Sequence, residues 1–124
     1  EERPQNAYAE LQPLGNHVRL MVHDALDAFA RLDIEAALRV AREDLKVDQK
    51  YDGLMRQMIT FMMEDPRTIS RMLNMIWAAR ALERIGDHAR NICEYIIYLV
   101  KGKDVRHTSL DQIEKELLGK PGDR

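Results

Sequence analysis

Residues 66–101 read PRTISRMLNMIWAARALERIGDHARNICEYIIYLVK, and this stretch decides the fold. Apolar residues recur in it every three or four positions, which is the spacing of one face of an α-helix and not of a strand. Asp65 and Pro66 form a typical helix start, with an acid as N-cap and proline in the first turn. Gly102 follows the last periodic residue and can adopt the left-handed conformation that ends a helix. The stretch therefore predicts one helix about 50 Å long.

Two further helices with the same spacing precede it. The first is expected at residues 13–31, with Pro13 tolerated in its first turn. The second is expected at residues 34–64, with Asp33 as its N-cap. The segments between the helices are short, so the connections are tight turns. Three long helices joined in this way predict an all-α, up-down-up three-helix bundle with antiparallel neighbours.

The chain of 124 residues is 45% hydrophobic, which is enough for one compact domain with its own core. We expect the bundle at residues 13–102, with a mobile or helical lead-in at residues 1–12. Residues 103–124 are expected to form a linker, a short helix and a frayed tail. The first residues are polar and no apolar run is long enough to span a bilayer, so neither a secretory leader nor membrane insertion is expected.

The composition argues against several functional classes. The formal net charge is only −2, so nucleic acid and anionic membranes are not expected partners. The single cysteine, Cys93, lies in an apolar segment and is expected to be a small buried hydrophobe. The sequence holds no glycine-rich phosphate loop, no H-E-x-x-H, no G-x-S-x-G, and no Glu-x-x-His pair of the kind that di-iron bundle oxidases use. Catalysis is therefore not expected.

Two pairs of carboxylates carry the chemistry that the sequence suggests. Asp44 and Asp48 take two positions in the apolar stripe of the second helix, and Glu83 and Asp87 lie one turn apart on the third. Residues four apart share a helix face, where like charges repel each other and an unpaired charge near apolar groups is costly. Carboxylate oxygens are the ligands that hard cations prefer. If the two helices pack side by side, the pairs converge into one four-carboxylate metal site.

An ordinary charged surface is the alternative explanation for these acids. Arg80 and Arg84 lie within one turn of the acids on the third helix and can form surface ion pairs with them. The histidines add little, because His17 is interpreted as a surface residue and His88 points about 100° away from its acidic neighbour. Spacing alone therefore leaves both a metal site and a solvated acidic face open.

Several separated blocks of this sequence resemble the PhoU family. They are HDALDAF at 23–29, AREDLKVD at 41–48, EDPRT at 64–68, LERIGDH at 82–88, NICE at 91–94 and YLVKGKDVRH at 98–107. Full-length members of the family contain two consecutive three-helix repeats, and this sequence is similar to the second. The resemblance implies that contacts with a first repeat are missing here, so that an apolar flank is exposed or associates with a second copy.

The resemblance also implies a function. PhoU-like proteins are cytoplasmic negative regulators of the phosphate-starvation response in bacteria, and they also restrain phosphate uptake. The implied partners are the ATPase subunit of the phosphate ABC transporter and the phosphate-sensing histidine kinase, with a homodimer as the expected assembly. The family's acidic motif, an acid followed four residues later by aspartate, is associated with metal binding. Its matches here imply a site for iron, manganese, magnesium or zinc formed by Asp44, Asp48, Glu83 and Asp87.

Two other functions stay open at this point. One is a generic helical-bundle dimerisation module that binds no metal and whose carboxylates form a solvated face. In such a module, as in an adaptor, Trp77 and Tyr95 are either anchors at a protein interface or half-buried core residues. The other is a carboxylate-bridged metalloenzyme, which the missing histidine ligands disfavour.

Overall fold

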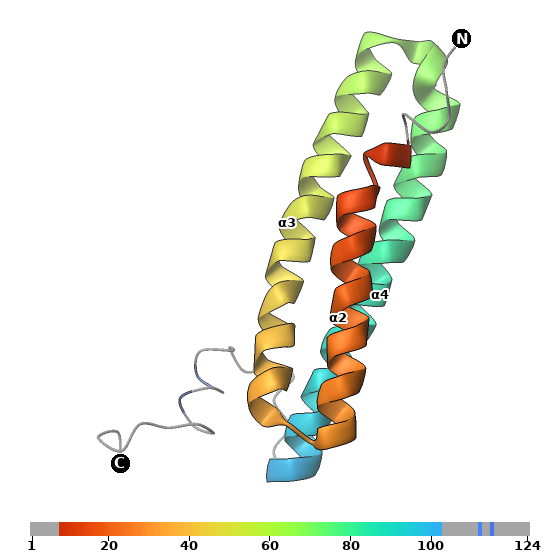
Figure 1. Cartoon of the computed structure of the whole chain (residues 1–124). Helices are drawn as coiled ribbons and strands as arrows, with labels where there is room; N and C mark the ends of the chain where they lie inside the picture. The colour runs from red at the N-terminus through yellow and green to blue at the C-terminus, as the bar shows by residue number, and fades with distance from the viewer. Residues whose placement is uncertain (1–7, 103–111, 113–114, 116–124) are drawn as a thin grey trace.

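The computed structural model describes residues 8–102 together with residues 112 and 115. Three long helices lie side by side, each antiparallel to the one before it in the chain (Figure 1), so the predicted all-α bundle is confirmed. The third long helix makes more contacts with the second helix than with the first. In chain order the elements are α2 (Gln12–Arg31), α3 (Ile34–Glu64), the 3-10 turn η1 (Pro66–Thr68) and α4 (Ile69–Lys101).

The ends of the chain are described only in part. Residues 8 and 9 of the expected lead-in are helical, and residue 12 already belongs to α2. Residues 112 and 115 are helical and exposed. Residues 1–7 and the remainder of the linker, short helix and tail expected at 103–124 lie outside the described residues.

Asp65 is the predicted cap with Pro66 in the first turn, but the prediction that this turn is α-helical is wrong. Residues Pro66–Thr68 form a 3-10 turn, and α4 begins only at Ile69. The Asp65 side chain accepts a hydrogen bond from the backbone N–H of Arg67 at 3.1 Å, two residues on rather than three. The backbone N–H of Thr68 donates to the Asp65 carbonyl oxygen at 2.9 Å, which closes the tighter turn, and the Thr68 hydroxyl donates to the same oxygen at 2.8 Å. The other end agrees with the sequence, since Gly102 ends α4 with φ 66°.

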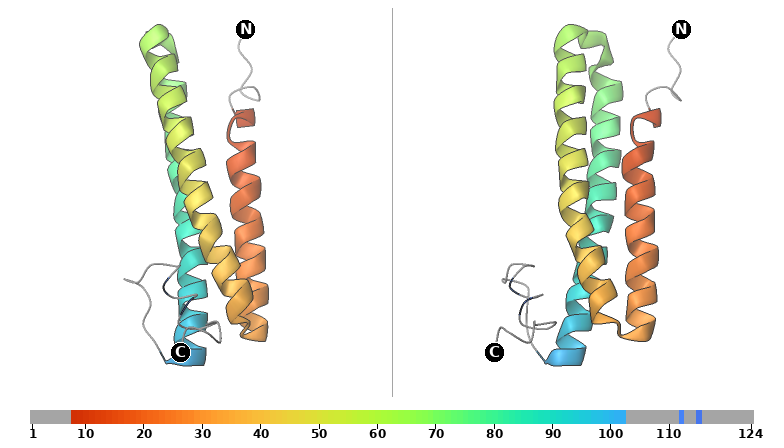
Figure 2. Two further views of the ribbon diagram at one scale, coloured as in Figure 1. Left: turned by 90° about the vertical axis from the view of Figure 1, so that its left-hand side faces the viewer. Right: turned by 60° about the vertical axis from the view of Figure 1, so that its left-hand side comes forward.

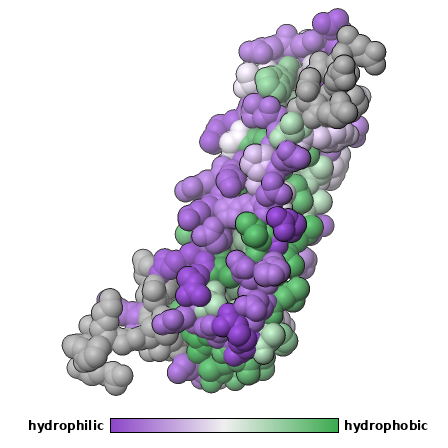
Figure 3. All heavy atoms as spheres, viewed as in Figure 1, coloured by the Kyte–Doolittle hydropathy of each residue, from purple (hydrophilic) through white to green (hydrophobic). Residues whose placement is uncertain are grey.

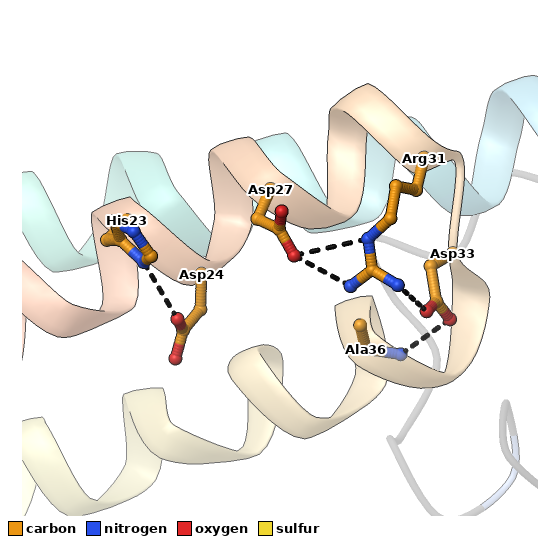
Figure 4. A network of polar contacts seen from close by, with 6 residues as sticks. All are labelled: His23, Asp24, Asp27, Arg31, Asp33 and Ala36. Carbon is orange, nitrogen blue, oxygen red and sulfur yellow. Dashed lines mark hydrogen bonds and ion pairs between the residues drawn. The ribbon is translucent and has the colours of Figure 1, made fainter.

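The turn between α2 and α3 is held by a small polar network (Figure 4). Arg31 donates to Asp27 at 2.7 Å and its other terminal nitrogen lies 3.2 Å from Asp33. Asp33 is also the predicted N-cap of α3, because its side chain accepts the backbone N–H of Ala36 at 3.0 Å. Between them Leu32 adopts a left-handed conformation with φ 50°, which lets the chain reverse without a glycine. One aspartate thus both caps a helix and fixes the turn.

Replacing Asp33 by alanine is expected to lower the free energy of unfolding by about 1 kcal/mol, the usual cost of losing an N-cap. Urea denaturation monitored by circular dichroism measures this. Asp24→Ala is the matched control, because Asp24 is an exposed aspartate of α2 whose side chain contacts the adjacent His23. An Asp33 variant as stable as that control would contradict the capping role.

The core runs along the line where the three helices meet. With 20 residues, α2 is shorter than α3 with 31 and α4 with 33, so the α3–α4 hairpin extends beyond the start of α2 (Figure 2). Cys93 is wholly buried in this core, as predicted. The methionines near the α3–α4 turn are mostly core residues, with the exception of the exposed Met63. The largest side chains with less than 2% exposure are Leu14, Met21, Met58, Met75, Ile96 and Ile97.

The surface is uneven. In the space-filling view, hydrophobic residues gather at the end of the bundle where α2 passes into α3, whereas the side formed by α3 is mostly hydrophilic (Figure 3). Trp77 and Tyr95 are 69% and 65% exposed, which excludes the half-buried core role for both. In the part of the chain that the structure describes, no helix is both long and apolar enough to cross a membrane.

Candidate metal-binding site

The packing of α3 against α4 brings the two acidic motifs together. One carboxylate oxygen from each of Asp44, Asp48 and Asp87 lies within 4.8 Å of the other two. Glu83 lies at the edge of this group, within hydrogen-bonding reach of Asp48. The geometry therefore places three of the four acids singled out by the sequence in one cluster and the fourth beside it.

The cluster is buried at one end and open at the other. Asp44 is 6% exposed and is the buried charged residue of the described core, Asp48 is intermediate and Asp87 is exposed. One oxygen of Asp44 and one of Asp48, both Oδ1, are buried without a hydrogen-bond partner. Buried polar atoms nearly always have a partner, so two such oxygens side by side need an explanation. A bound cation would provide it.

The electrostatics of the cluster favour the same explanation. Burial, followed by the charges of Asp48 and Asp87, raises the pKa of Asp44 to about 6. Burial and then Asp87 raise the pKa of Asp48 as well. The pKa of Glu83 rises through burial and through the neighbouring carboxylates of Asp87 and Asp48. Like charges repel, so it is unfavourable for these carboxyl groups to be ionised at the same time. A bound cation would offset that free-energy cost.

The cation that the fold itself brings to the cluster is Arg90. Its Nη1 lies 3.8 Å from Asp44 Oδ2, while its Nε donates to Glu94 at 3.1 Å. Sequence spacing had indicated Arg80 and Arg84 as the ion-pair partners instead. Among the described residues neither forms an ion pair with the cluster, although the charge of Arg80 works against the rise of the Glu83 pKa. Arg90 was missed, although it lies only three positions after Asp87.

Gly86 is the packing residue that lets α4 approach this region. It is buried, and a Cβ added to it would lie 3.5 Å from Val47, 3.7 Å from Val18 and 3.8 Å from Asp44 Oδ1. These are ordinary van der Waals contacts, so the space around Gly86 is filled by side chains of both other helices. The glycine therefore marks the point where three helices meet, directly beside the unpartnered oxygen of Asp44.

A second polar network corrects the interpretation of His17 as a surface residue. Its side chain is only 13% exposed, and Nε2 lies 2.7 Å from Glu43. The ammonium of Lys50 donates to Nδ1 at 2.9 Å, so Nε2 carries the proton and donates to Glu43. That hydrogen bond, with further help from Lys46, holds the pKa of Glu43 below its usual value. Glu43 thus links α3 to α2 and is not part of the acidic cluster.

The donor set suits a hard cation. All the candidate ligand atoms are carboxylate oxygens, which magnesium, manganese and iron accept readily, whereas zinc sites in proteins are built mostly from cysteine and histidine. His88 is exposed and is not among the grouped ligands, as expected from its position on the helix. The residues present therefore fit a divalent or trivalent cation held between α3 and α4.

Comparison with known proteins places the chain in a family. Residues 11–96 match the model of the PhoU domain. The chain belongs to the PhoU family. It is 51% identical over 123 residues to the phosphate-specific transport system accessory protein PhoU of Escherichia coli K12, covering 99% of this chain and 51% of that protein. It is 54% identical over 116 residues to the PhoU homolog of Pseudomonas aeruginosa, covering 94% of this chain and 48% of the relative.

A solved structure of the family has the same fold. The crystal structure of PhoU from Pseudomonas aeruginosa matches with a TM-score of 0.75 and 58% identity, covering 77% of this chain and 46% of that one. The chain therefore spans about half the length of these PhoU relatives. The resemblance to the PhoU family is confirmed, and this chain corresponds to a single PhoU domain of three helices.

Proposed function

We propose that this PhoU domain binds a divalent or trivalent cation between α3 and α4, and that it serves as a regulatory, non-catalytic accessory protein of phosphate transport. The ligands would be Asp44, Asp48 and Asp87, with Glu83 as a fourth at the edge. The observation that carries the proposal is the buried Oδ1 of Asp44, which has no hydrogen-bond partner and lies among the other carboxylates. Names of relatives support the accessory role.

A cation at this position would act structurally. Asp44 and Asp48 belong to α3, and Asp87 belongs to α4, so a shared ion ties the two longest helices together. Binding only to the folded state stabilises that state in proportion to the logarithm of the ion concentration above its Kd. An ion whose protein ligands all lie on these two helices would therefore control the stability of the α3–α4 hairpin. Such control suits a protein that presents surfaces to its partners.

The metal proposal is tested by titrating the metal-free chain with Mn²⁺ in a calorimeter and by following its Tm. Wild type is expected to bind and to gain thermal stability, whereas Asp44→Asn loses at least tenfold in affinity because it removes the most buried ligand. Asp52→Asn is the matched control, since Asp52 is an exposed acid one turn further along α3. Equal binding by all three proteins, or no binding by wild type with Mn²⁺, Mg²⁺ or Fe²⁺, would overturn the proposal in favour of a metal-free dimerisation module.

The protein contacts are proposed for the outer face of α4. Large apolar side chains there are exposed at roughly helical spacing, namely Ile69, Leu73, Trp77, Ile85, Tyr95 and Leu99. The relatives are about twice as long as this chain. We propose that this face packs against the other half of a full-length protein, and that two copies of the isolated chain pair through it as a homodimer. Sedimentation equilibrium tests this, because Trp77→Glu would then shift the chain toward monomer, whereas Arg39→Glu, at an exposed position of α3, would not.

The partners of the whole protein are proposed from the family. They are the ATPase subunit of the phosphate ABC transporter and the phosphate-sensing histidine kinase, both in the cytoplasm, where the complex would restrain phosphate uptake and the starvation response. The relatives' name, phosphate-specific transport system accessory protein, supports the transporter contact. Copurification of full-length protein with each partner is the test. Failure to retain either one from detergent-solubilised membranes would contradict the adaptor role.

A further inference from the structure

We propose that Arg90, held by Glu94, is a positioning residue that competes with the metal ion for Asp44 and so sets the affinity of the site. This inference rests on the proposed metal binding and adds its regulation. It assigns a role to two residues outside the acidic motifs. Both are on α4, one turn apart, and both are largely shielded from solvent, with side chains 23% and 14% exposed.

The two contacts of Arg90 differ in kind. Toward Glu94 it makes a hydrogen bond, with Nε 3.1 Å from Oε2 and within the same helix. Toward Asp44 it makes only a long ion pair of 3.8 Å, which is beyond hydrogen-bonding distance. Arg90 is therefore anchored on one acid and offers its remaining N–H groups to the other. A guanidinium has five donors, so it can serve both acids, and it can leave Asp44 while keeping Glu94.

Arg90 and a metal ion cannot both be the close counter-charge of Asp44. The approach of a cation to the Asp44 carboxylate brings two positive charges together beside one buried acid, in a region where charges are weakly screened. The positive charge of Arg90 also acts on Asp48, so Arg90 opposes metal binding at both ligands on α3. Moving the guanidinium toward Glu94 relieves the repulsion at little cost. Glu94 thus remains the ion-pair partner of Arg90 when the ion binds.

The other charged groups around the cluster do not provide this contact. Arg80 acts on the far end of the site at Glu83. On α3, the neighbouring basic residues Lys46 and Lys50 are engaged by Glu43 and His17 instead. Asp52 adds negative charge at the exposed end of α3. Arg90 is the cation that pairs with Asp44 at the buried end of the cluster.

Mn²⁺ affinities of four full-chain proteins test this inference by calorimetry: wild type, Arg90→Gln, Glu94→Gln and the double variant. Arg90→Gln is expected to bind about tenfold more tightly, because the competing charge is gone. Glu94→Gln is expected to bind about tenfold more weakly, because Arg90 then turns fully to Asp44. In the double variant the Glu94 change is expected to have no effect, since its action passes through Arg90. Arg84→Gln, an exposed arginine of the same helix, controls for the loss of one positive charge.

The outcomes separate this inference from the proposal on which it rests. If wild type binds Mn²⁺ and the two single changes have purely additive effects in the double variant, Arg90 acts only through distant charge and the inference is wrong while the metal site stands. If Arg90→Gln binds no more tightly than Arg84→Gln, it is also wrong. Binding by Arg90→Gln but not by wild type would support competition and refute metal occupancy in the wild type. Absence of binding in all four would overturn both.

Discussion

Asp44→Asn is expected to stabilise the metal-free protein by about 2 kcal/mol at pH 7.5. The wild-type carboxyl has a pKa raised from 3.8 to about 6, mainly by burial, so its ionised form is disfavoured in the folded state. At about 1.4 kcal/mol for each pKa unit, ionising it at neutral pH costs the fold about 3 kcal/mol. Asparagine has nearly the same shape and carries no charge, but its buried amide is imperfectly paired, which reduces the gain. Urea denaturation in the presence of EDTA measures the difference.

The same carboxyl gives the metal-free protein a characteristic pH dependence. Below pH 3.8 Asp44 is protonated in both the folded and the unfolded chain, and it costs nothing. As the pH rises toward 6, the unfolded chain loses this proton first, so the folded state loses stability until both forms are ionised. The raised pKa values of Asp48 and Glu83 act in the same direction. The lowered pKa of Glu43 acts in the opposite direction and is common to wild type and variant.

Wild type without metal is therefore expected to lose stability between pH 4 and pH 7 by about 2.5 kcal/mol more than Asp44→Asn. Added Mn²⁺ is expected to reverse the slope for wild type only, because the metal binds the deprotonated ligands. Asp52→Asn serves again as the exposed control. Parallel pH profiles for wild type and Asp44→Asn, or an Asp44 variant that is less stable at pH 7.5, would show that the buried, ionised carboxylate does not destabilise the folded state.

Helix limits could be predicted from this sequence because their signals are local. Asp33 and Gly102 act within a few residues of themselves, and both ends agree with the structure. The first turn at Pro66–Thr68 was mispredicted although its signal is also local. Asp followed by proline starts either an α-helix or a 3-10 turn, and the backbone hydrogen bond from the N–H of Thr68 to the Asp65 carbonyl oxygen, at 2.9 Å, makes this one the tighter turn. The two kinds of turn differ in their backbone hydrogen bonds, and the spacing of residues in the sequence does not distinguish them.

The acidic site was only partly predictable, for a different reason. Spacing along one helix places Asp44 beside Asp48, but the depth of each acid depends on how closely α4 approaches. That approach is set at Gly86, a residue for which spacing along the helix indicates no role. The pairing of His17 with Glu43 spans 26 positions, and no local pattern indicates it. Arg90 could have been found from its spacing to Asp87, whereas its anchor on Glu94 required the side-chain geometry.

Gly86 is also the position of the second large expected effect. Gly86→Leu is expected to lower the free energy of unfolding by about 3 kcal/mol, near the upper end of the usual cost of overfilling a packed interior. Its Cβ would be accommodated, but the three carbons beyond it would meet Val47 and Val18, which already lie at 3.5 and 3.7 Å from the Cβ position. The helices would have to separate, and the acids on α3 and α4 would separate with them.

Gly86→Ala is the matched control, because it adds only the atom that fits. It is expected to leave the protein equally stable or to stabilise it by up to about 1 kcal/mol, since alanine favours a helix interior over glycine. Gly86→Leu is also expected to weaken Mn²⁺ binding at temperatures where it stays folded, because Asp44 and Asp87 no longer converge. A leucine variant as stable as the alanine variant would mean that α4 can move away freely. The close meeting of three helices at Gly86 would then not be what holds the carboxylates together.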